Sequence, residues 1–127
     1  MAGELETPWE SESIPDESVL YMRVHRAMLN ANGEPVLGAF KDHGGAMSTD
    51  WEKYSTPEQT RQRARVPEDN AVISLVVGQV RGIDGLSVEH TPDSAINNRA
   101  HVDVYGEKTA EVRVQLRRIY RMILGLK

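Results

Sequence analysis

The sequence predicts an α+β domain: a small, mostly antiparallel sheet of about five short strands, packed by a C-terminal amphipathic helix, with a second short surface helix. Several short stretches alternate apolar and polar residues, which is the period of a half-buried strand. One stretch near the C-terminus instead repeats its apolar residues at helical spacing. The two kinds of stretch do not alternate regularly, so a doubly wound parallel sheet is disfavoured.

The composition sets limits on what the chain can be. Its 127 residues fit one domain, and 39% apolar with 27% charged residues is ordinary for a globular protein. The chain has no cysteine, which excludes disulfides, thiolate metal sites and cysteine nucleophiles. No run approaches the roughly 18 apolar residues of a membrane span, and no secretion signal is visible. We therefore expect a cytoplasmic protein that does not contact a membrane.

Charge divides the chain into an acidic N-terminal segment, residues 1–18, and a single α+β domain, residues 19–127. The segment carries six acidic side chains and no Lys or Arg, a composition that predicts flexibility. Residues 109–127 carry five basic side chains and one Glu. Such polarity either serves a partner or lets one end of the chain neutralise the other, and we favour neutralisation.

The first predicted strand covers residues 19–25, where apolar and polar side chains alternate. The alternation places Tyr21, Arg23 and His25 on one face. A turn cluster then precedes residues 34–40, which we expect to form a second short strand.

A third short strand is expected over residues 46–51, after a paired-glycine break. Thr56-Pro57-Glu58-Gln59 then predicts a helix start, with a hydroxyl cap, Pro at the first helical position and Gln at the capping-box position. We expect this helix to run to about Ala64 and to lie on the surface, because it lacks an apolar stripe.

The most apolar stretch is residues 71–77, which its β-branched content marks as a buried strand, although a buried helix remains open. Residues 86–90 and 100–105 alternate again and predict two more strands. A final helix should run from the cap Thr109 to about Leu124. Its apolar residues share one face and are Val112, Leu116, Ile119, Tyr120 and Ile123.

Four polar residues on two predicted strands form the candidate catalytic set: Arg23, His25, His101 and Asp103. If the strands are neighbours, the two imidazoles can serve as general base and general acid, and the guanidinium can stabilise a phosphate or carboxylate charge. The alternative, which we favour, is an ordinary solvent-facing sheet surface with cross-strand ion pairs.

The other candidates are weaker. His43 and His90 lie in no metal-ligand spacing, so we expect no metal, and the glycine-rich turns lack the features of a phosphate loop, so we expect no cofactor. Arg113, Arg117 and Arg121 form a stripe on the last predicted helix. These arginines, with Tyr21, are candidate binding residues, and the stripe could track a nucleic-acid backbone.

Two motifs resemble a loose family of small bacterial and phage proteins. Leu20 to His25 reads Leu-Tyr-Met-Arg-Val-His, and Asn98 to Lys108 reads Asn-Arg-Ala-His-Val-Asp-Val-Tyr-Gly-Glu-Lys. Family members open with Leu-Tyr-Arg-x-Val/Ile-His and close with Asn-Pro-Ala-His-x-x-Val-x-Gly-x-Lys. The resemblance spans residues 19 to about 124 and departs at Arg99, where the family has Pro. It implies that the arginine and the two histidines of these motifs belong together, and it implies no activity.

A fainter resemblance concerns the NAD-consuming ADP-ribosyl-transfer toxins, which also carry a Tyr-x-Arg strand early in a β-rich domain. The resemblance implies a Ser-Thr strand and a late Glu, roles that Ser48-Thr49 and either Glu89 or Glu107 would fill.

Three functional hypotheses follow. The first is a non-catalytic binding or accessory protein that acts through protein–protein contacts in a bacterial or phage conflict system, with the basic helix face and the acidic segment as contact surfaces. The second is a small enzyme acting on a phosphate-bearing or NAD-like substrate. The third is nucleic-acid binding through the arginine stripe, although a net charge of −4 disfavours it. Homo-oligomerisation stays open.

Overall fold

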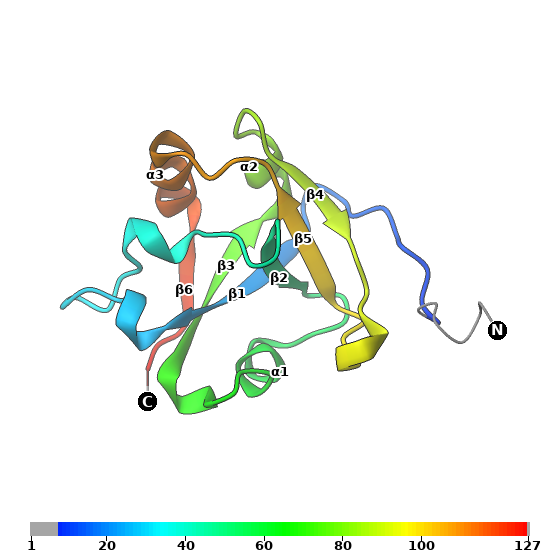
Figure 1. The fold of residues 1–127 in the computed structure, drawn as a ribbon, viewed down its shortest axis with the longest axis horizontal. Helices are drawn as coiled ribbons and strands as arrows, with labels where there is room; N and C mark the ends of the chain where they lie inside the picture. Colours follow the sequence, from blue (N-terminus) through cyan, green and yellow to red (C-terminus); the bar gives the residue numbers. More distant parts are fainter. Residues whose placement is uncertain (1–7, 127) are drawn as a thin grey trace.

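A six-stranded antiparallel sheet organises residues 8–126, the part of the chain that the computed structural model describes (Figure 1). The strands are β1 (Val19–His25), β2 (Met47–Trp51), β3 (Asn70–Val76), β4 (Ser87–His90), β5 (His101–Tyr105) and β6 (Arg121–Leu124). The helices are α1 (Pro57–Gln62), α2 (Val77–Arg81) and α3 (Ala110–Ile119). The strand order is β4-β5-β2-β1-β3-β6, and every neighbouring pair is antiparallel. The predicted α+β class is confirmed, with one strand more than expected.

Two predicted elements differ in the structure. Residues 34–40 form no strand and contain a single 3₁₀ turn, Leu37–Ala39. The final helix ends at Ile119, because Tyr120 turns extended at φ −69° and ψ 157°. The next four residues pair with the free edge of β3 as β6. Backbone hydrogen bonds from that open edge replace the helical ones that residues 121–124 would otherwise make.

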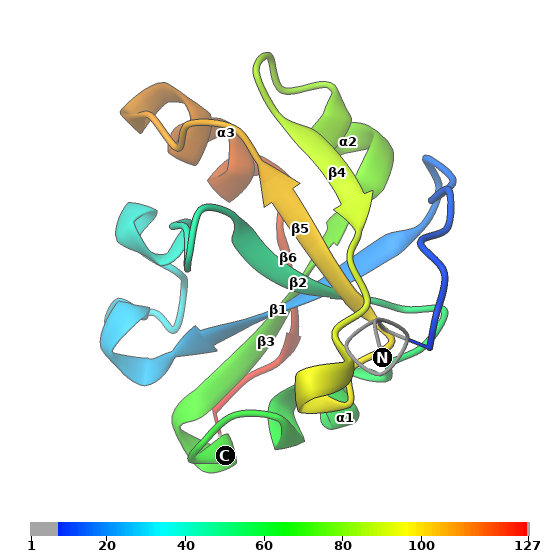
Figure 2. The same ribbon diagram turned by 45° about the vertical axis from the view of Figure 1, so that its right-hand side comes forward.

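Alternation along β1 decides which face of the sheet is inside. Leu20, Met22 and Val24 are at most 5% exposed and contribute to the hydrophobic core. Helices α2 and α3 cover this core (Figures 1 and 2). Fully burying a side chain such as Leu20 contributes about 2 kcal/mol, so turning β1 over would be strongly disfavoured. The odd-numbered residues of β1 therefore face the opposite side.

Helix α1 lies against that opposite side, at the end away from α2 and α3 (Figure 2). The predicted capping box is present: Thr56 Oγ1 accepts from the Gln59 N–H at 3.1 Å, and Gln59 Oε1 accepts from the Thr56 N–H at 2.9 Å. The helix ends at Gln62 rather than Ala64. It is not simply a surface helix, because Thr60 and Arg61 are buried against the sheet, and Arg61 donates to the Gly125 carbonyl. Polar rather than apolar contacts hold it, which is why no apolar stripe marks it.

The acidic segment contributes residues 8–18 to the structure, and its residues 1–7 lie outside the described part. Ile14 is buried in the core. Glu12 pairs with Lys53 at 2.6 Å and Asp16 with Arg81 at 2.7 Å, so these two acids neutralise cations outside the C-terminal arginine stripe. The flexibility predicted for residues 1–18 stays a prediction.

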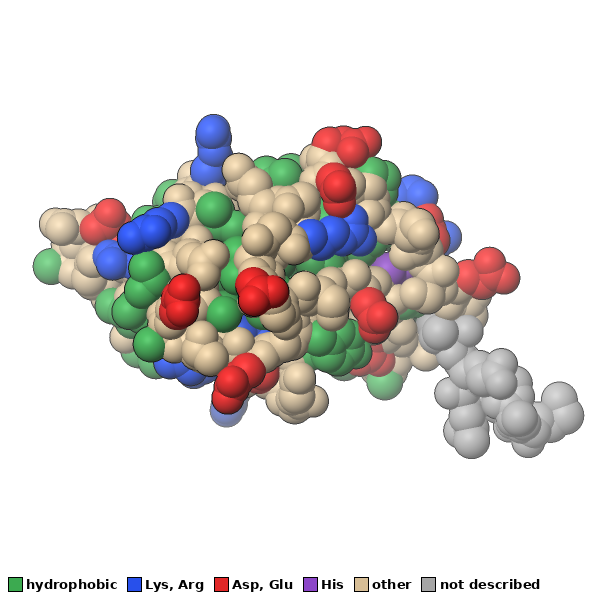
Figure 3. All heavy atoms as spheres, turned by 90° about the horizontal axis from the view of Figure 1, so that it is seen from above, with side chains coloured by type: hydrophobic (Ala, Val, Ile, Leu, Met, Phe, Trp, Pro, Cys, Tyr) green, Lys and Arg blue, Asp and Glu red, His purple; other side chains and the backbone are tan. Residues whose placement is uncertain are grey.

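The surface carries charges of both signs. From above, Lys and Arg side chains are interspersed with Asp and Glu (Figure 3). Within residues 8–126, the structure contains no helix that is both long enough and apolar enough to cross a lipid bilayer.

Candidate functional site

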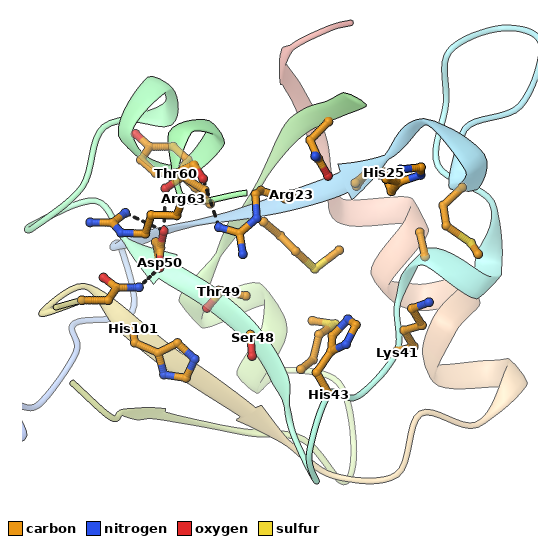
Figure 4. Close-up of a pocket in the computed structure, with 18 of the residues that line it drawn as sticks. Arg23, His25, Lys41, His43, Ser48, Thr49, Asp50, Thr60, Arg63 and His101 are labelled. Atoms are coloured by element: carbon orange, nitrogen blue, oxygen red, sulfur yellow. Dashed lines mark hydrogen bonds and ion pairs between the residues drawn. The ribbon is translucent and has the colours of Figure 1, made fainter. Parts of the chain in front are cut away.

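A pocket of about 540 Å³ opens between β1 and β2, and side chains from both faces of β1 line it, including Met22 and Val24 as well as Arg23 (Figure 4). Its floor comes from β1 and β2, and its walls from α1, the start of β5 and the loops that carry Lys41, His43 and Asn98. This volume lies within the range of ordinary small-molecule sites, roughly 300–1,000 Å³. The pocket is therefore large enough to hold a small-molecule ligand.

Strand register brings residues distant in sequence into this pocket. Tyr21 lies opposite Asp50 on β2, and Asp50 lies opposite His101 on β5. Side chains on one face of a strand recur every second residue, so Arg23 and then His25 follow Tyr21 along β1. All five residues line the pocket.

Asp50 joins three parts of the pocket wall. Its carboxylate is buried and accepts hydrogen bonds from Thr60 Oγ1 at 2.8 Å, Arg63 Nη1 at 2.9 Å and Asn98 Nδ2 at 2.8 Å. These bonds link β2 to α1 and to the loop before β5. Since three donors already use it, Asp50 serves as a structural carboxylate that neutralises Arg63.

Arg23 is the cation that lacks such neutralisation. Its guanidinium donates one hydrogen bond, from Nη1 to the Thr60 carbonyl at 3.0 Å. No carboxylate within residues 8–126 comes within 4.0 Å of it. Burial lowers the pKa of Arg23 from its ordinary value, Asp50 opposes that effect and Arg63 reinforces it. The Arg23 side chain is nevertheless exposed to solvent, so an anion could reach it and supply the negative charge that no carboxylate provides at close range.

Further polar groups stand free beside Arg23. In the described part of the chain, the side chains of Lys41, His43 and Ser48 have no hydrogen-bond or ion-pair partner. Figure 4 shows Lys41 and His43 on the side of the pocket toward His25. The loop that carries them is anchored by the buried Lys108, whose ammonium donates to Asp42 Oδ1 at 2.7 Å.

The two histidines predicted as an acid–base pair do not meet. Both line the pocket, but they stand at its opposite ends (Figure 4). The register places His25 four residues along the sheet from the row of His101, roughly 13 Å at about 3.3 Å per residue. The structure therefore does not bring the two rings within hydrogen-bond reach of one substrate atom, and their catalytic role stays a prediction.

Each of these histidines instead has local partners. His25 Nδ1 accepts from the Ala27 N–H at 3.0 Å, which caps the following 3₁₀ turn. His101 Nδ1 lies 3.0 Å from the Thr91 hydroxyl, and its Nε2 lies 3.8 Å from Asp103 Oδ1. Asp103 itself does not line the pocket and accepts from the Tyr105 hydroxyl at 3.4 Å.

The predicted arginine stripe is divided between two elements. Arg117 donates to the Pro35 carbonyl at 2.9 Å, and Arg113 is half-buried with its Nε enclosed. Arg121 belongs to strand β6. These residues therefore form no continuous helical stripe, and the nucleic-acid and protein–protein hypotheses that used one stay predictions. Tyr21 lines the pocket, where burial and then Glu52 raise the pKa of its phenol.

Sequence reasoning missed several pocket residues. Asp50 and Arg63 stood out in no motif, because only the pairing of β2 with β1 and the packing of α1 bring them beside Arg23. It also left His90 unassigned, a residue that is 2% exposed. His90 lies two residues after the apolar Val88 on β4, and that spacing is a signal that could have placed it on the inner face.

The residues that the toxin resemblance implied are dispersed. Ser48 lines the pocket, Thr49 donates its hydroxyl to the Val102 carbonyl, and Glu89 and Glu107 are exposed away from the pocket lining. No three His, Asp or Glu residues of the described chain gather as a metal site would require.

Comparison with known proteins finds no matching family model, no matching curated protein and no matching solved structure.

Proposed function

We propose that the protein binds a small anionic molecule in the pocket between β1, β2 and α1, with Arg23 as the cation that contacts its phosphate or carboxylate group. The observation that carries the proposal is the contrast between two arginines in one pocket. Arg63 is neutralised by Asp50 at 2.9 Å, whereas Arg23 has only a carbonyl partner. This proposal develops the hypothesis of a phosphate-bearing ligand without its acid–base pair.

The chemistry of the lining supports anion binding. A guanidinium presents five N–H donors in a planar fork that matches the oxygens of a phosphate or carboxylate. One donor of Arg23 reaches the Thr60 carbonyl, which orients the fork and leaves the others for a ligand. Lys41 adds a second cation, and Ser48 and His43 add neutral polar groups.

Titration calorimetry on the full chain tests the proposal with inorganic phosphate, pyrophosphate and citrate as probes. We expect at least one probe to bind, and Arg23→Gln to weaken that probe at least tenfold, equivalent to about 1.4 kcal/mol. Arg23→Lys should recover part of the affinity, because it restores the charge but not the fork.

Arg65→Gln is the matched control, since Arg65 is exposed, lies outside the pocket lining and loses the same charge. The affinity of Arg65→Gln for the same probe should stay within twofold of wild type. Equal weakening in Arg23→Gln and Arg65→Gln, or no binding of any probe, would contradict the proposal.

A further inference from the structure

Uncompensated positive charge occupies only one half of the pocket. Arg23 and Lys41 have no carboxylate within 4.0 Å in the described chain, and Figure 4 shows them, together with His43, from the middle of the pocket toward the end that His25 occupies. This half is suited to a negatively charged group.

The other half is electrically balanced. Arg63 is paired with Asp50, and Asn98 donates to the same carboxylate. His101 stands 3.8 Å from the Asp103 carboxylate. A second anion placed there would meet the oxygens of Asp50 with no spare cation. This half therefore suits an uncharged group.

The lining of the balanced half is chemically mixed. Nδ1 of His101 lies 3.0 Å from the Thr91 hydroxyl and 3.1 Å from the Thr91 carbonyl, whereas Nε2 lies 3.8 Å from the Asp103 carboxylate, beyond hydrogen-bond distance, and remains available to a ligand. Ile96 stands at the rim and is 61% exposed, an unusually open position for a branched apolar side chain. Together they offer one apolar and one hydrogen-bonding contact.

Size points the same way. The pocket measures about 540 Å³. A single phosphate group, with one phosphorus and four oxygen atoms, would fill only a minor part of that volume. Ligands in pockets of this volume commonly bury most of their surface. A bare anion on Arg23 would leave the balanced half filled with water.

We infer that the ligand is an organic phosphate monoester, with its phosphate on the Arg23, Lys41 and His43 side and its uncharged organic group against Asn98, His101 and Ile96. A monoester carries about 1.5 to 2 negative charges at pH 7. The two cations Arg23 and Lys41 balance that charge more closely than they would balance the single negative charge of a carboxylate. The inference rests on the proposed anion binding and adds the class of ligand.

The test compares inorganic phosphate, ribose 5-phosphate, adenosine 5′-monophosphate and acetate by calorimetry at one ionic strength. We expect at least one of the two esters to bind tenfold or more tightly than inorganic phosphate, and acetate to bind most weakly. Ile96→Ser should lower the affinity for the ester at least threefold. The affinity of the same variant for inorganic phosphate should stay within twofold of wild type.

Val66→Ser is the matched control, because Val66 is also exposed, at 40%, and lies outside the pocket. His101→Gln gives a second variant of the balanced half and should also weaken only the esters. If inorganic phosphate binds through Arg23 but neither ester binds more tightly, the inference fails and the proposed function stands. If no anion binds, both fail. If acetate binds more tightly than the esters, the assignment to phosphate is wrong.

Discussion

The backbone N–H of Glu12 donates a hydrogen bond to Nδ1 of His90 at 3.0 Å, which ties the N-terminal segment to the edge strand β4. His90 is buried, and its Nε2 donates to the Arg99 carbonyl at 2.7 Å, so both ring nitrogens are used. Asn98, which directly precedes Arg99 in the chain, donates a hydrogen bond to Asp50 in the pocket wall. Contacts of the acidic segment therefore continue, residue by residue, to the candidate site.

The Glu12 side chain should contribute to stability in a pH-dependent way. Hydrogen bonds from Lys53 and Tyr54 lower the pKa of Glu12 below its ordinary value of 4.5. A carboxyl whose pKa is lower when folded stabilises the fold fully above its unfolded pKa and loses that contribution as the pH falls through the folded value. We expect the melting temperature of wild type to exceed that of Glu12→Gln at pH 7, and the difference to shrink as the pH falls from about 5 toward 3.

Melting curves between pH 3 and pH 7 check this. Asp84→Asn removes an exposed acid that has no partner in the described chain, so its difference from wild type should stay small at each pH. A Glu12→Gln difference that is constant across this range would rule out the proposed linkage.

Gly106 should tolerate no side chain. It adopts φ +118°, and a Cβ there would lie 2.1 Å from the Gly85 carbonyl oxygen. Gly44 also has a positive φ, +69°, but a Cβ there meets nothing within 4 Å. We expect Gly44→Ala to lower the free energy of unfolding by about 1 kcal/mol from backbone strain alone. Gly106→Ala should cost several times more, because the backbone of the 85–86 turn must move.

Urea unfolding of the two variants measures the difference. Similar losses in both would mean that the 85–86 turn yields freely and that the close approach does not constrain the fold.

Asp50 should be a stability residue rather than a ligand contact. Asp50→Ala leaves Arg63 without its carboxylate and removes the acceptor of Thr60 and Asn98. Removing one partner of a buried ion pair typically costs 3–5 kcal/mol, and since Arg63 is partly exposed we expect about 3 kcal/mol. Urea denaturation of Asp50→Ala and the exposed control Asp84→Asn checks this, and a loss under about 1 kcal/mol would contradict the structural role.

Local patterns predicted the strands that alternate most regularly. β1 and β5 have the expected residues on their inner faces, because a one-residue error would expose several large apolar side chains to water. The pattern worked less well at the C-terminus. Residues 109–124 are periodic enough for one helix, but the open edge of β3 competes for residues 121–124 and wins. The spacing of apolar residues within one segment carries no information about a strand edge elsewhere in the chain that can pair with it.

The candidate site was only partly visible in the sequence. Arg23, His25 and His101 were singled out, and all three line one pocket. Their arrangement was not visible, because the relative positions of two strands depend on register and on the strand between them. β2 lies between β1 and β5, so Asp50 and Ser48 stand between the predicted residues.

The sequence by itself determined which side chains share a face of each strand, where α1 begins and which fold class results, because all three depend on neighbours within a few residues along the chain. Only the tertiary structure decided that Asp50 neutralises Arg63 and leaves Arg23 without a carboxylate. That difference arises from strand order, register and the packing of α1, which bring together residues separated by tens of positions in the chain.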